Sequence, residues 1–312
     1  MSSVKIFSGK STQYLAEKIA KSYGKPLGEV TLQKFSDGEM SPFFTESVRG
    51  SDVFLIQSTF PPADNFLELL LLIDAAKRAS AKYVTVVVPY FGYARQDRKD
   101  KPRVAIAAKL MANLLSAAGA DRIMTCDLHA DQIQGFFDIP LDHLDGTSIF
   151  IPYIRSLKLE DIIFASPDVG GVKRTRSFAK FFRAEMVVCD KYREKANEVA
   201  SMRLIGDVEG KDVVMVDDLI DTGGTICKAA ALLKDKGAKS VRAVATHPIL
   251  SGKAYENIEN SVLEELVITD TLPLKDEEKC SKIKVLSVSD LFAKAIRKIH
   301  DHESISSLFI NS

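Results

Sequence analysis

The sequence lacks the features that would assign it to a membrane, to secretion or to nucleic acid. Its most apolar segment, residues 66–76, is interrupted by Glu68 and Asp74 and falls well short of the ~20 apolar residues that a membrane-spanning helix needs. The first residues contain no basic region followed by a long apolar stretch, so we expect no secretory signal. The chain contains 42 Lys and Arg residues and 42 Asp and Glu residues, so its formal net charge is zero. The chain as a whole therefore has no positive potential that would attract nucleic acid or an anionic membrane. Any anion site must therefore be local.

Cysteine is scarce and is not arranged for pairing. Cys126, Cys189, Cys227 and Cys280 lie far apart and show no CxxC spacing. This pattern favours a reducing compartment over a disulfide framework. We therefore expect a cytoplasmic protein.

A Walker A phosphate loop is also missing. Gly9-Lys10-Ser11 has the Gly-Lys-Ser ending of such a loop, but Val4 stands where the first glycine of the motif would be. We interpret these three residues as a plain turn. A phosphate-binding loop has to be sought elsewhere in the chain.

What the sequence does contain is a regular alternation of strand-like and helix-like segments. The 312 residues, 46% hydrophobic and 27% charged, suit two globular domains of ~100–200 residues each. Short runs rich in Val and Ile alternate with helix-period segments, which predicts an α/β protein whose mostly parallel sheets are flanked by helices. The predicted strands are Val4–Ser8, Val30–Phe35, Val53–Ser58, Tyr83–Pro89, Arg122–Asp127, Ile162–Ser166, Met186–Asp190, Val213–Asp217, Val241–Thr246, Leu266–Thr269 and Lys284–Val288.

The domain boundary is predicted near residue 145. The segment from Gly135 to Gly146 contains Pro140 and few periodic residues. We predict domains over residues 1–145 and 146–312, with the last helix a candidate to pack back on the N-terminal domain. Gly119 and Gly237 fit helix C-termini that require a left-handed residue.

The most informative motif follows the strand predicted to end at Asp217. Its residues are Asp217, Asp218, Asp221, Thr222, Gly223, Gly224 and Thr225. A small-residue loop that leads into a helix N-terminus offers backbone N–H groups to a phosphate monoester, and the two Thr hydroxyls add donors. The carboxylates at the strand end can accept hydrogen bonds from vicinal sugar hydroxyls. A simple helix cap would explain one polar residue, but not the adjoining acidic pair.

This motif resembles the ribose 5-phosphate loop of phosphoribosyltransferases and ribose-phosphate diphosphokinases, and by itself it does not separate the two. The rest of the chain resembles the diphosphokinase family from residues 6–9 to residues 303–309, nearly full length. The resemblance implies two phosphoribosyltransferase-like domains and a Mg²⁺-dependent enzyme. In the implied reaction, the 1-hydroxyl of ribose 5-phosphate attacks the β-phosphorus of ATP and AMP leaves. It also implies dimers assembled into hexamers, which no residue pattern shows.

Two segments of the N-terminal half resemble ATP-binding elements of this family. Phe35, Asp37 and Glu39 match a segment in which an aromatic ring stacks on adenine and carboxylates accept from the exocyclic amine; taken alone, these residues indicate a turn. The second segment matches the ATP loop through Arg95, Gln96 and Asp97. Five cations between residues 95 and 103 are more than a solvated turn needs, and a polyanion is a natural partner for them.

Metal ligands are implied at His129 and Asp168. His129 follows a strand end, and the resemblance makes it a Mg²⁺ ligand on the ATP side, although imidazole is an unusual ligand for so hard a cation. From the chemistry alone, a hydrogen-bonded loop histidine is favoured. Asp168, with Gly170 and Gly171 in a glycine-rich turn before a helix, resembles the diphosphate loop of the family.

Lys191 and Arg193 match a catalytic element of the family, and Arg193 is also expected to contact ribose 5-phosphate. Without the resemblance, they would be a solvated, charged strand end. The chain departs from the family at Tyr192, where many members carry a third basic residue. It departs again in the ATP flap, where residues 104–105 replace an expected proline next to an added Pro102.

A regulatory anion site is a further implication of the resemblance. Five residues of the chain match positions that lie near this anion site in regulated members of the family: Ser47, Arg49, Arg103, Ser304 and Ser306. Alternatives to the diphosphokinase are a phosphoribosyltransferase, which has no need of an adenine segment, and an inert regulatory subunit, which would be expected to lose catalytic residues. A DNA-binding sensor on the same fold is disfavoured by the zero net charge.

Overall fold

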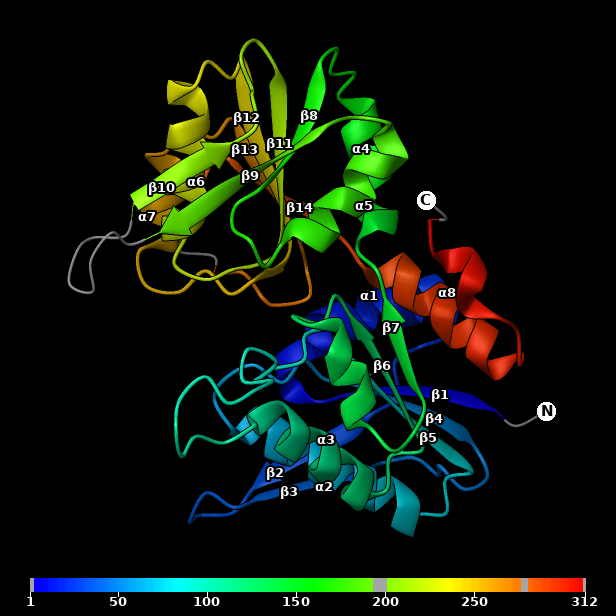
Figure 1. Ribbon diagram of the computed structural model, residues 1–312. Coiled ribbons are helices and arrows are strands. Elements are labelled where there is room, and N and C mark those ends of the chain that lie inside the picture. The colour runs from blue at the N-terminus through cyan, green and yellow to red at the C-terminus, as the bar shows by residue number, and fades with distance from the viewer. Residues whose placement is uncertain (1–2, 193–200, 276–279, 311–312) are drawn as a thin grey trace. The chain divides into compact units, whose positions relative to one another are not determined.

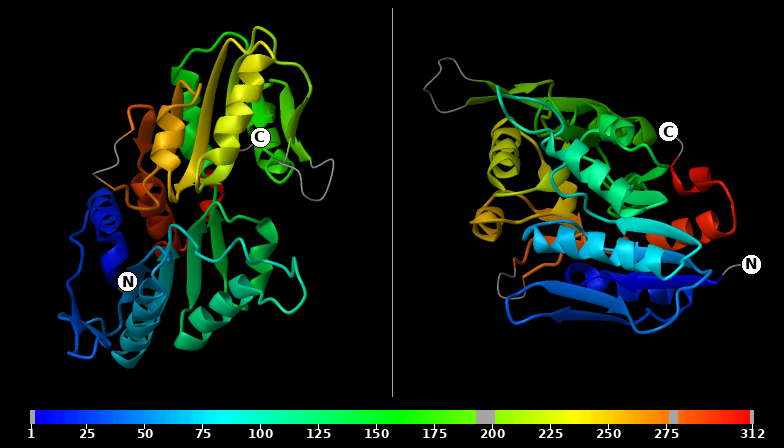
Figure 2. Two further views of the ribbon diagram at one scale, coloured as in Figure 1. Left: turned by 90° about the vertical axis from the view of Figure 1, so that its left-hand side faces the viewer. Right: turned by 90° about the horizontal axis from the view of Figure 1, so that it is seen from below.

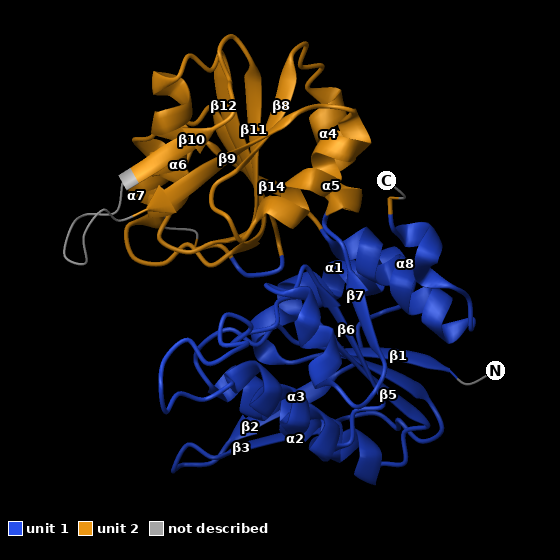
Figure 3. Cartoon of the chain, viewed as in Figure 1, with its two compact units in different colours: residues 1–146, 271–273, 288–309 blue, residues 147–270, 274–287, 310–312 orange. Residues whose placement is uncertain are grey.

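The computed structural model describes residues 3–192, 201–275 and 280–310, and the chain divides into two compact units (Figure 3). Unit 1 comprises residues 1–146, 271–273 and 288–309, and unit 2 comprises residues 147–270, 274–287 and 310–312. None of the described helices is long and apolar enough to cross a membrane.

The central sheet of unit 1 has five parallel strands whose order in space, β1-β4-β5-β6-β7, follows their order in the sequence (Figure 1). These strands are β1 (Val4–Ser8), β4 (Asp52–Ile56), β5 (Tyr83–Val88), β6 (Arg122–Cys126) and β7 (Leu141–Leu144). A separate antiparallel hairpin is formed by β2 (Val30–Lys34) and β3 (Met40–Phe44). Each crossover adds its strand on the same side, so the strand order of this sheet never reverses.

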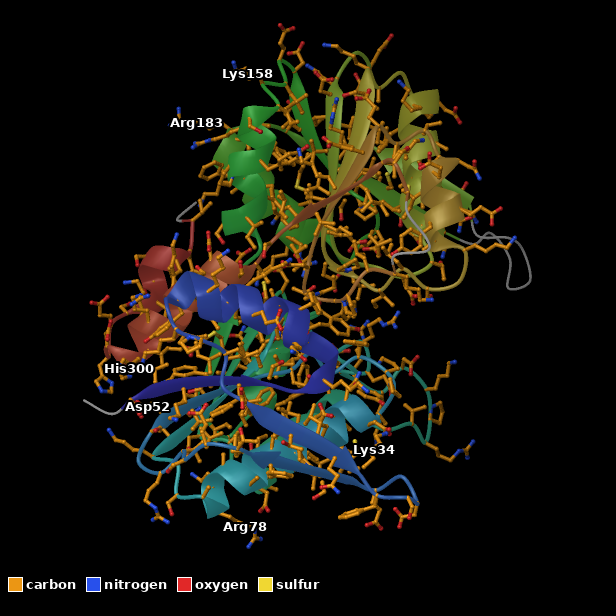
Figure 4. All side chains as sticks on the ribbon, turned by 180° about the vertical axis from the view of Figure 1, so that it is seen from behind. Lys34, Asp52, Arg78, Lys158, Arg183 and His300 are labelled. Atoms are coloured by element: carbon orange, nitrogen blue, oxygen red, sulfur yellow. The ribbon has the colours of Figure 1, made fainter. Side chains whose placement is uncertain are left out.

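Helices cover the sheet of unit 1, and one of them comes from the far end of the sequence. The helices are α1 (Gln13–Tyr23), α2 (Asp64–Arg78), α3 (Ala107–Ala118) and α8 (Ser289–His300), with short 3₁₀ turns η1 (Lys10–Thr12), η2 (Asp131–Phe136) and η3 (Ile305–Leu308). Helix α8 packs beside α1, where Arg297 donates a 2.6 Å hydrogen bond to the backbone carbonyl of Tyr23. At the end of α8, His300 Nδ1 lies 2.9 Å from Asp52 Oδ2 (Figure 4).

The sheet of unit 2 has seven strands in the order β10-β9-β8-β11-β12-β13-β14, parallel except for β10. They are β8 (Ile162–Ser166), β9 (Met186–Tyr192), β10 (Ser201–Ile205), β11 (Asp212–Ile220), β12 (Ser240–Pro248), β13 (Glu265–Thr269) and β14 (Ile283–Leu286). The chain first builds outward from β8 to β10 and then returns to start again at β11. Ligands of open α/β sheets bind beyond the carboxyl ends of strands at such a reversal, here between β8 and β11.

Both faces of the unit 2 sheet are buried under helices, which are α4 (Thr147–Ser156), α5 (Val172–Phe182), α6 (Gly224–Asp235) and α7 (Ala254–Glu259) (Figure 1, Figure 2). Val213 and Met215 of β11 join the core on the α6 and α7 face, whereas Val214 and Val216 join the core on the α4 and α5 face. Alternation of side chains along a strand produces this division. It also explains why β11 is apolar at consecutive positions.

The predicted fold class is confirmed, and each predicted strand corresponds to an observed one. The structure adds β3, β7 and β10, which the apolar pattern did not indicate. Strand β3 contains Pro42, and strand β7 is short and carries Asp142 and His143. Gly119 and Gly237 have φ of +106° and +88°, as their predicted places at helix C-termini require.

Candidate functional site

The acidic pair Asp217 and Asp218 lies inside β11, beyond the end of its neighbour β8. Strand β11 continues to Ile220 because β12 offers backbone partners as far as Pro248. Strand β8 pairs with β11 only as far as Ala165, opposite Met215. The expectation that the strand ends at Asp217 is therefore wrong, and the pair lies on a flank of β11 that β8 leaves open.

The two carboxylates of this pair interact unfavourably. Asp218 is 5% exposed, and its backbone N–H donates a 2.9 Å hydrogen bond to Asp217 Oδ1. The pKa of Asp217 lies well above the ordinary value, first because burial disfavours the charged form and then because Asp218 and Asp168 add negative charge. Arg174 acts in the opposite direction on the same pKa.

Arg174 is a charged residue of this site that the sequence interpretation did not assign. It lies near the start of α5, and its Nη1 is 3.6 Å from Asp218 Oδ1. The signal available in the sequence was a basic pair, Lys173 and Arg174, separated by Val172 from two glycines. Nothing in the sequence paired that arginine with an aspartate 44 residues later, because the pairing depends on how α5 packs on β11.

The loop after β11 leads into the N-terminus of α6. Gly223 has φ of +74°, a conformation that favours glycine, and no side chain caps the first turn of α6. Thr222 and Thr225 are exposed. The base of the loop is held by Ser251, whose N–H donates to the Asp221 carbonyl at 3.0 Å and whose hydroxyl donates to the Asp221 carboxylate. This arrangement suits an anion at the helix N-terminus.

The loop after β8 is closed around Asp168. Gly171 N–H donates to Asp168 Oδ1 at 3.0 Å, and the Ser166 hydroxyl donates to the Asp168 carbonyl at 2.6 Å. A Cβ atom on Gly171 would lie 2.8 Å from Ser166 Oγ, so a side chain here would displace the hydroxyl that binds the Asp168 carbonyl. Gly170 is exposed beside it.

Lys191 stands at the described end of the β9–β10 hairpin. It is exposed and pairs in register with Met202. The guanidinium carbon of Arg203 lies over the ring of the neighbouring Tyr192, 5.5 Å from the ring centroid. Arg203 also binds Asp190, with Nη2 2.8 Å from Oδ2. Arg193 lies outside the described residues.

In unit 1, the segment predicted to bind adenine forms the exposed turn of the β2–β3 hairpin. Phe35 N–H donates to the Glu39 carbonyl at 2.9 Å, and Glu39 N–H donates to Asp37 Oδ1 at 3.1 Å. Gly38 closes the turn with φ of +97°. The Phe35 side chain is 51% exposed, although it is a large apolar group.

The loop of residues 95–97, which is predicted to bind ATP, and the loop of His129 are both exposed and contact each other within unit 1. Arg95, Gln96 and His129 are exposed. Asp97 Oδ2 accepts a 3.0 Å hydrogen bond from the side-chain amide of Gln132, three residues after His129. The two predicted ATP-side segments are therefore joined by a hydrogen bond.

His143 is a second residue that the sequence interpretation missed. Its Nε2 lies 2.8 Å from Leu128 N and accepts from that N–H, and its Nδ1 lies 4.0 Å from Asp131 Oδ1. It thereby supports the loop that carries His129. Among the described residues, no group of three or more His, Cys, Asp or Glu side chains is placed to hold a metal ion.

The residues expected at a regulatory anion site come from separate segments of unit 1. Ser47 Oγ accepts from Arg49 N–H at 3.4 Å, and Arg103 is exposed with φ of +62°. Ser304 caps η3, where its Oγ accepts from Ser306 N–H at 3.2 Å.

Comparison with known proteins identifies the family. The fold and the paired loops define an α/β protein with an uncapped helix N-terminus at a reversal of strand order. Residues 4–119 match the N-terminal domain of ribose phosphate pyrophosphokinase, and residues 183–310 match the phosphoribosyl synthetase-associated domain. The chain belongs to the ribose-phosphate pyrophosphokinase family. This confirms the family, and the enzyme class, predicted from the sequence.

Relatives match the chain over almost its whole length. It is 57% identical to the ribose-phosphate pyrophosphokinase of Porphyromonas gingivalis over 305 residues, which cover 97% of each chain. It is 56% identical to that of Campylobacter jejuni over 311 residues, 99% of this chain and 100% of that one. The crystal structure of phosphoribosylpyrophosphate synthetase from Mycobacterium smegmatis is similar, with a TM-score of 0.91, 39% identity, and coverage of 96% of this chain and 100% of that chain.

Proposed function

We propose that the chain transfers the terminal diphosphate of ATP to the 1-hydroxyl of ribose 5-phosphate, giving AMP and 5-phospho-α-D-ribose 1-diphosphate. The observation that carries this proposal is the acidic pair Asp217 and Asp218 beside the uncapped N-terminus of α6, at the reversal of strand order in unit 2. One sugar phosphate uses both features, because it presents vicinal hydroxyls at one end and a dianion at the other.

The loop after β11 supplies the contacts to ribose 5-phosphate. Backbone N–H groups of Gly223 and Gly224, with the hydroxyls of Thr222 and Thr225, bind the 5-phosphate. The acidic group formed by Asp217, Asp218 and Asp221 supplies the hydrogen-bond acceptors for the ribose hydroxyls. Hydrogen bonds to charged acceptors contribute about 1.5–3 kcal/mol each, so the acids determine much of the sugar specificity.

The acidic surroundings of Asp168 fit a hard divalent cation. The negative charges of Asp168 and Asp218 both raise the pKa of Asp217, and a bound cation would offset this repulsion. Mg²⁺ prefers such oxygen ligands and shares its coordination with substrate phosphates. Asp168 would hold the ion beside the diphosphate loop of Gly170 and Gly171, and His129 would hold one on the ATP side. The bound ion would neutralise charge on the phosphate oxygens.

The exposed segments of unit 1 bind the nucleotide. Phe35 offers a ring face for adenine, and Asp37 and Glu39 accept from its amino group. Base stacking on an aromatic side chain contributes about 1–3 kcal/mol. Arg95, Gln96 and Asp97 form the adjacent loop, in which Arg95 and Gln96 reach the nucleotide.

Lys191 and Arg193 stabilise charge that develops on the transferred group. None of the described residues of the site is placed to act as a nucleophile. Direct in-line attack by the sugar hydroxyl requires no such residue. Preorganised cations act most strongly where charge appears in the transition state. The assignment of Arg193 rests on the resemblance, because that residue lies outside the described part of the chain.

We infer further that the chain acts in the cytoplasm as a homo-oligomer, a hexamer of dimers. Exposed apolar side chains support self-association: Leu67 on α2 and Leu114 on α3 are 51% and 37% exposed, and Leu110, one turn before Leu114, is 51% exposed. Ser47, Arg49, Arg103, Ser304 and Ser306 would bind a regulatory anion. Light scattering of the purified protein tests the assembly, and a mass of one chain would contradict it.

The reaction is tested by the nucleotide that is formed. The purified protein is incubated with Mg²⁺, ATP and ribose 5-phosphate, and the products are separated by ion-exchange chromatography. AMP in equal amount to the sugar diphosphate supports the proposal. ADP as the product would indicate an ordinary kinase, and no turnover would favour the inert regulatory subunit.

A further inference from the structure

Arg174 interacts with both members of the acidic pair of β11. Its side chain is 20% exposed, and its Nη1 lies 3.6 Å from Asp218 Oδ1, an ion-pair distance that is too long for a hydrogen bond. Its charge also lowers the pKa of Asp217 against the effects of burial and of the neighbouring carboxylates. Arg174 therefore offsets negative charge across the whole pair.

Strand geometry explains why Asp218, rather than Asp217, meets this arginine. Asp218 shares a face of β11 with Val214 and Val216, which pack in the core beneath α4 and α5. Arg174 belongs to α5, which begins directly after the loop of Asp168. The ion pair thus connects the loop assigned to diphosphate with the strand assigned to the sugar.

The pairing leaves the two acids in different situations. Two adjacent carboxylates repel each other, and a mostly buried cation reduces that repulsion more effectively than solvent does. Asp218 is buried and faces the guanidinium, whereas Asp217 is partly exposed and belongs to the part of β11 that β8 does not pair. Asp217 is therefore the member better placed to accept a hydrogen bond from a ligand.

We propose that Arg174 is a positioning residue for ribose 5-phosphate: it fixes Asp218 by charge pairing and leaves Asp217 to accept hydrogen bonds from the sugar hydroxyls. This inference rests on the proposed function, since it assumes that the sugar binds at the β11 loop. It assigns the two adjacent aspartates different tasks, and it gives α5 a part in sugar binding.

Steady-state kinetics of Arg174→Met tests the assignment. Methionine keeps much of the apolar stem and removes the charge. We expect KM for ribose 5-phosphate to rise about tenfold, which corresponds to about 1.4 kcal/mol, with kcat and KM for ATP nearly unchanged. Arg174→Lys should recover part of the loss. The matched control is Arg176→Met, an exposed cation of the same helix, which should leave every constant unchanged.

A double-mutant cycle with Asp218→Asn distinguishes positioning from direct contact with substrate. If Arg174 acts through Asp218, Arg174→Met should cost less than about twofold in KM in the Asp218→Asn background, because coupled residues are not additive. A full effect in that background, or a larger rise in KM for ATP, would overturn the inference and indicate that Arg174 binds a phosphate itself.

Calorimetry separates failure of this inference from failure of the proposed function. If the wild-type protein forms no AMP, the proposed reaction is wrong. Binding of ribose 5-phosphate to the wild type and to Arg174→Met then decides the role of Arg174 without turnover. Equal affinities would overturn the inference. Thermal melting of each variant identifies any loss of folding, and in that case the comparison is made with Arg174→Lys.

Discussion

The two units carry their candidate residues in different ways. In unit 2, the acids lie within or directly beside a sheet whose strand order reverses, and hydrogen bonds within the loops hold them. In unit 1, the strand order never reverses, and the candidate residues stand on exposed turns such as that of Phe35. The site proposed for the sugar is therefore preorganised at a cost in electrostatic repulsion, whereas the site proposed for the nucleotide is built on surface turns.

Metal removal gives the largest expected effect and tests both units together. EDTA should abolish turnover, and excess Mg²⁺ should restore it, because the cation is proposed to neutralise the charge on the phosphate oxygens. The fold should survive, since substrate-assisted sites of this kind are not structural cages. Circular dichroism before and after chelation measures this, and loss of helical signal would argue for a structural metal.

Substitution of Lys191 should affect the chemical step and neither binding site. Lys191→Ala should lower kcat roughly 10²–10⁴-fold with little change in either KM, because its contact strengthens as charge moves in the transition state. Single-turnover assays would separate chemistry from product release. Lys236→Ala, an exposed lysine at the far end of α6, is the control. A raised KM for ATP with normal kcat would make Lys191 a ground-state binding group.

Asp217→Asn tests the preorganised acidic site of unit 2. Loss of hydrogen bonds to a charged acceptor should cost about 1.5–3 kcal/mol in ribose 5-phosphate binding, seen as a raised KM for the sugar and not for ATP. Varying each substrate in turn measures the two constants. Asp235→Asn, at the end of α6, serves as control. An unchanged sugar KM beside a raised ATP KM would overturn the loop assignment.

Phe35→Ala tests the exposed turn of unit 1. Loss of stacking should cost about 1 kcal/mol of ATP binding, the low end for base stacking on an aromatic side chain, and this should appear as a raised KM for ATP. The melting temperature should not change, because the ring is half exposed. Phe43→Ala removes another exposed ring from the same hairpin and should leave KM for ATP unchanged. Equal effects of the two substitutions would mean that the hairpin, and not Phe35, matters.

The smallest expected effect is on stability. The pKa of Asp217 is raised above 3.8 in the folded protein, so at a pH between the unfolded and the folded pKa the folded protein holds a proton that the unfolded chain releases. The stability contributed by that proton is lost as pH rises through the folded pKa. Asp217→Asn should therefore raise the melting temperature of the ligand-free protein by about 2–4 °C near pH 8. The difference should shrink as pH falls toward 3.8. A lower melting temperature at pH 8 would contradict the repulsion at the site.

The sequence predicted the strands with buried, consecutive apolar residues, because burial on both faces of a parallel sheet leaves that pattern in the chain. Strands that lack the pattern were missed: β3 contains Pro42, and β7 is short and half polar. The loops of Asp168 and Asp217 were found through their glycines and acids. The roles given to their residues remain predictions.

By itself, the sequence determined the fold class, the family and the position of each candidate loop, since these depend on local pattern and on motif. Only the tertiary structure decided that β11 runs three residues past Asp217 beside β12, that β8 stops short of the acidic pair, and that α5 brings Arg174 to Asp218. These contacts join residues far apart in the chain. They follow from strand register and helix packing, which no local spacing encodes.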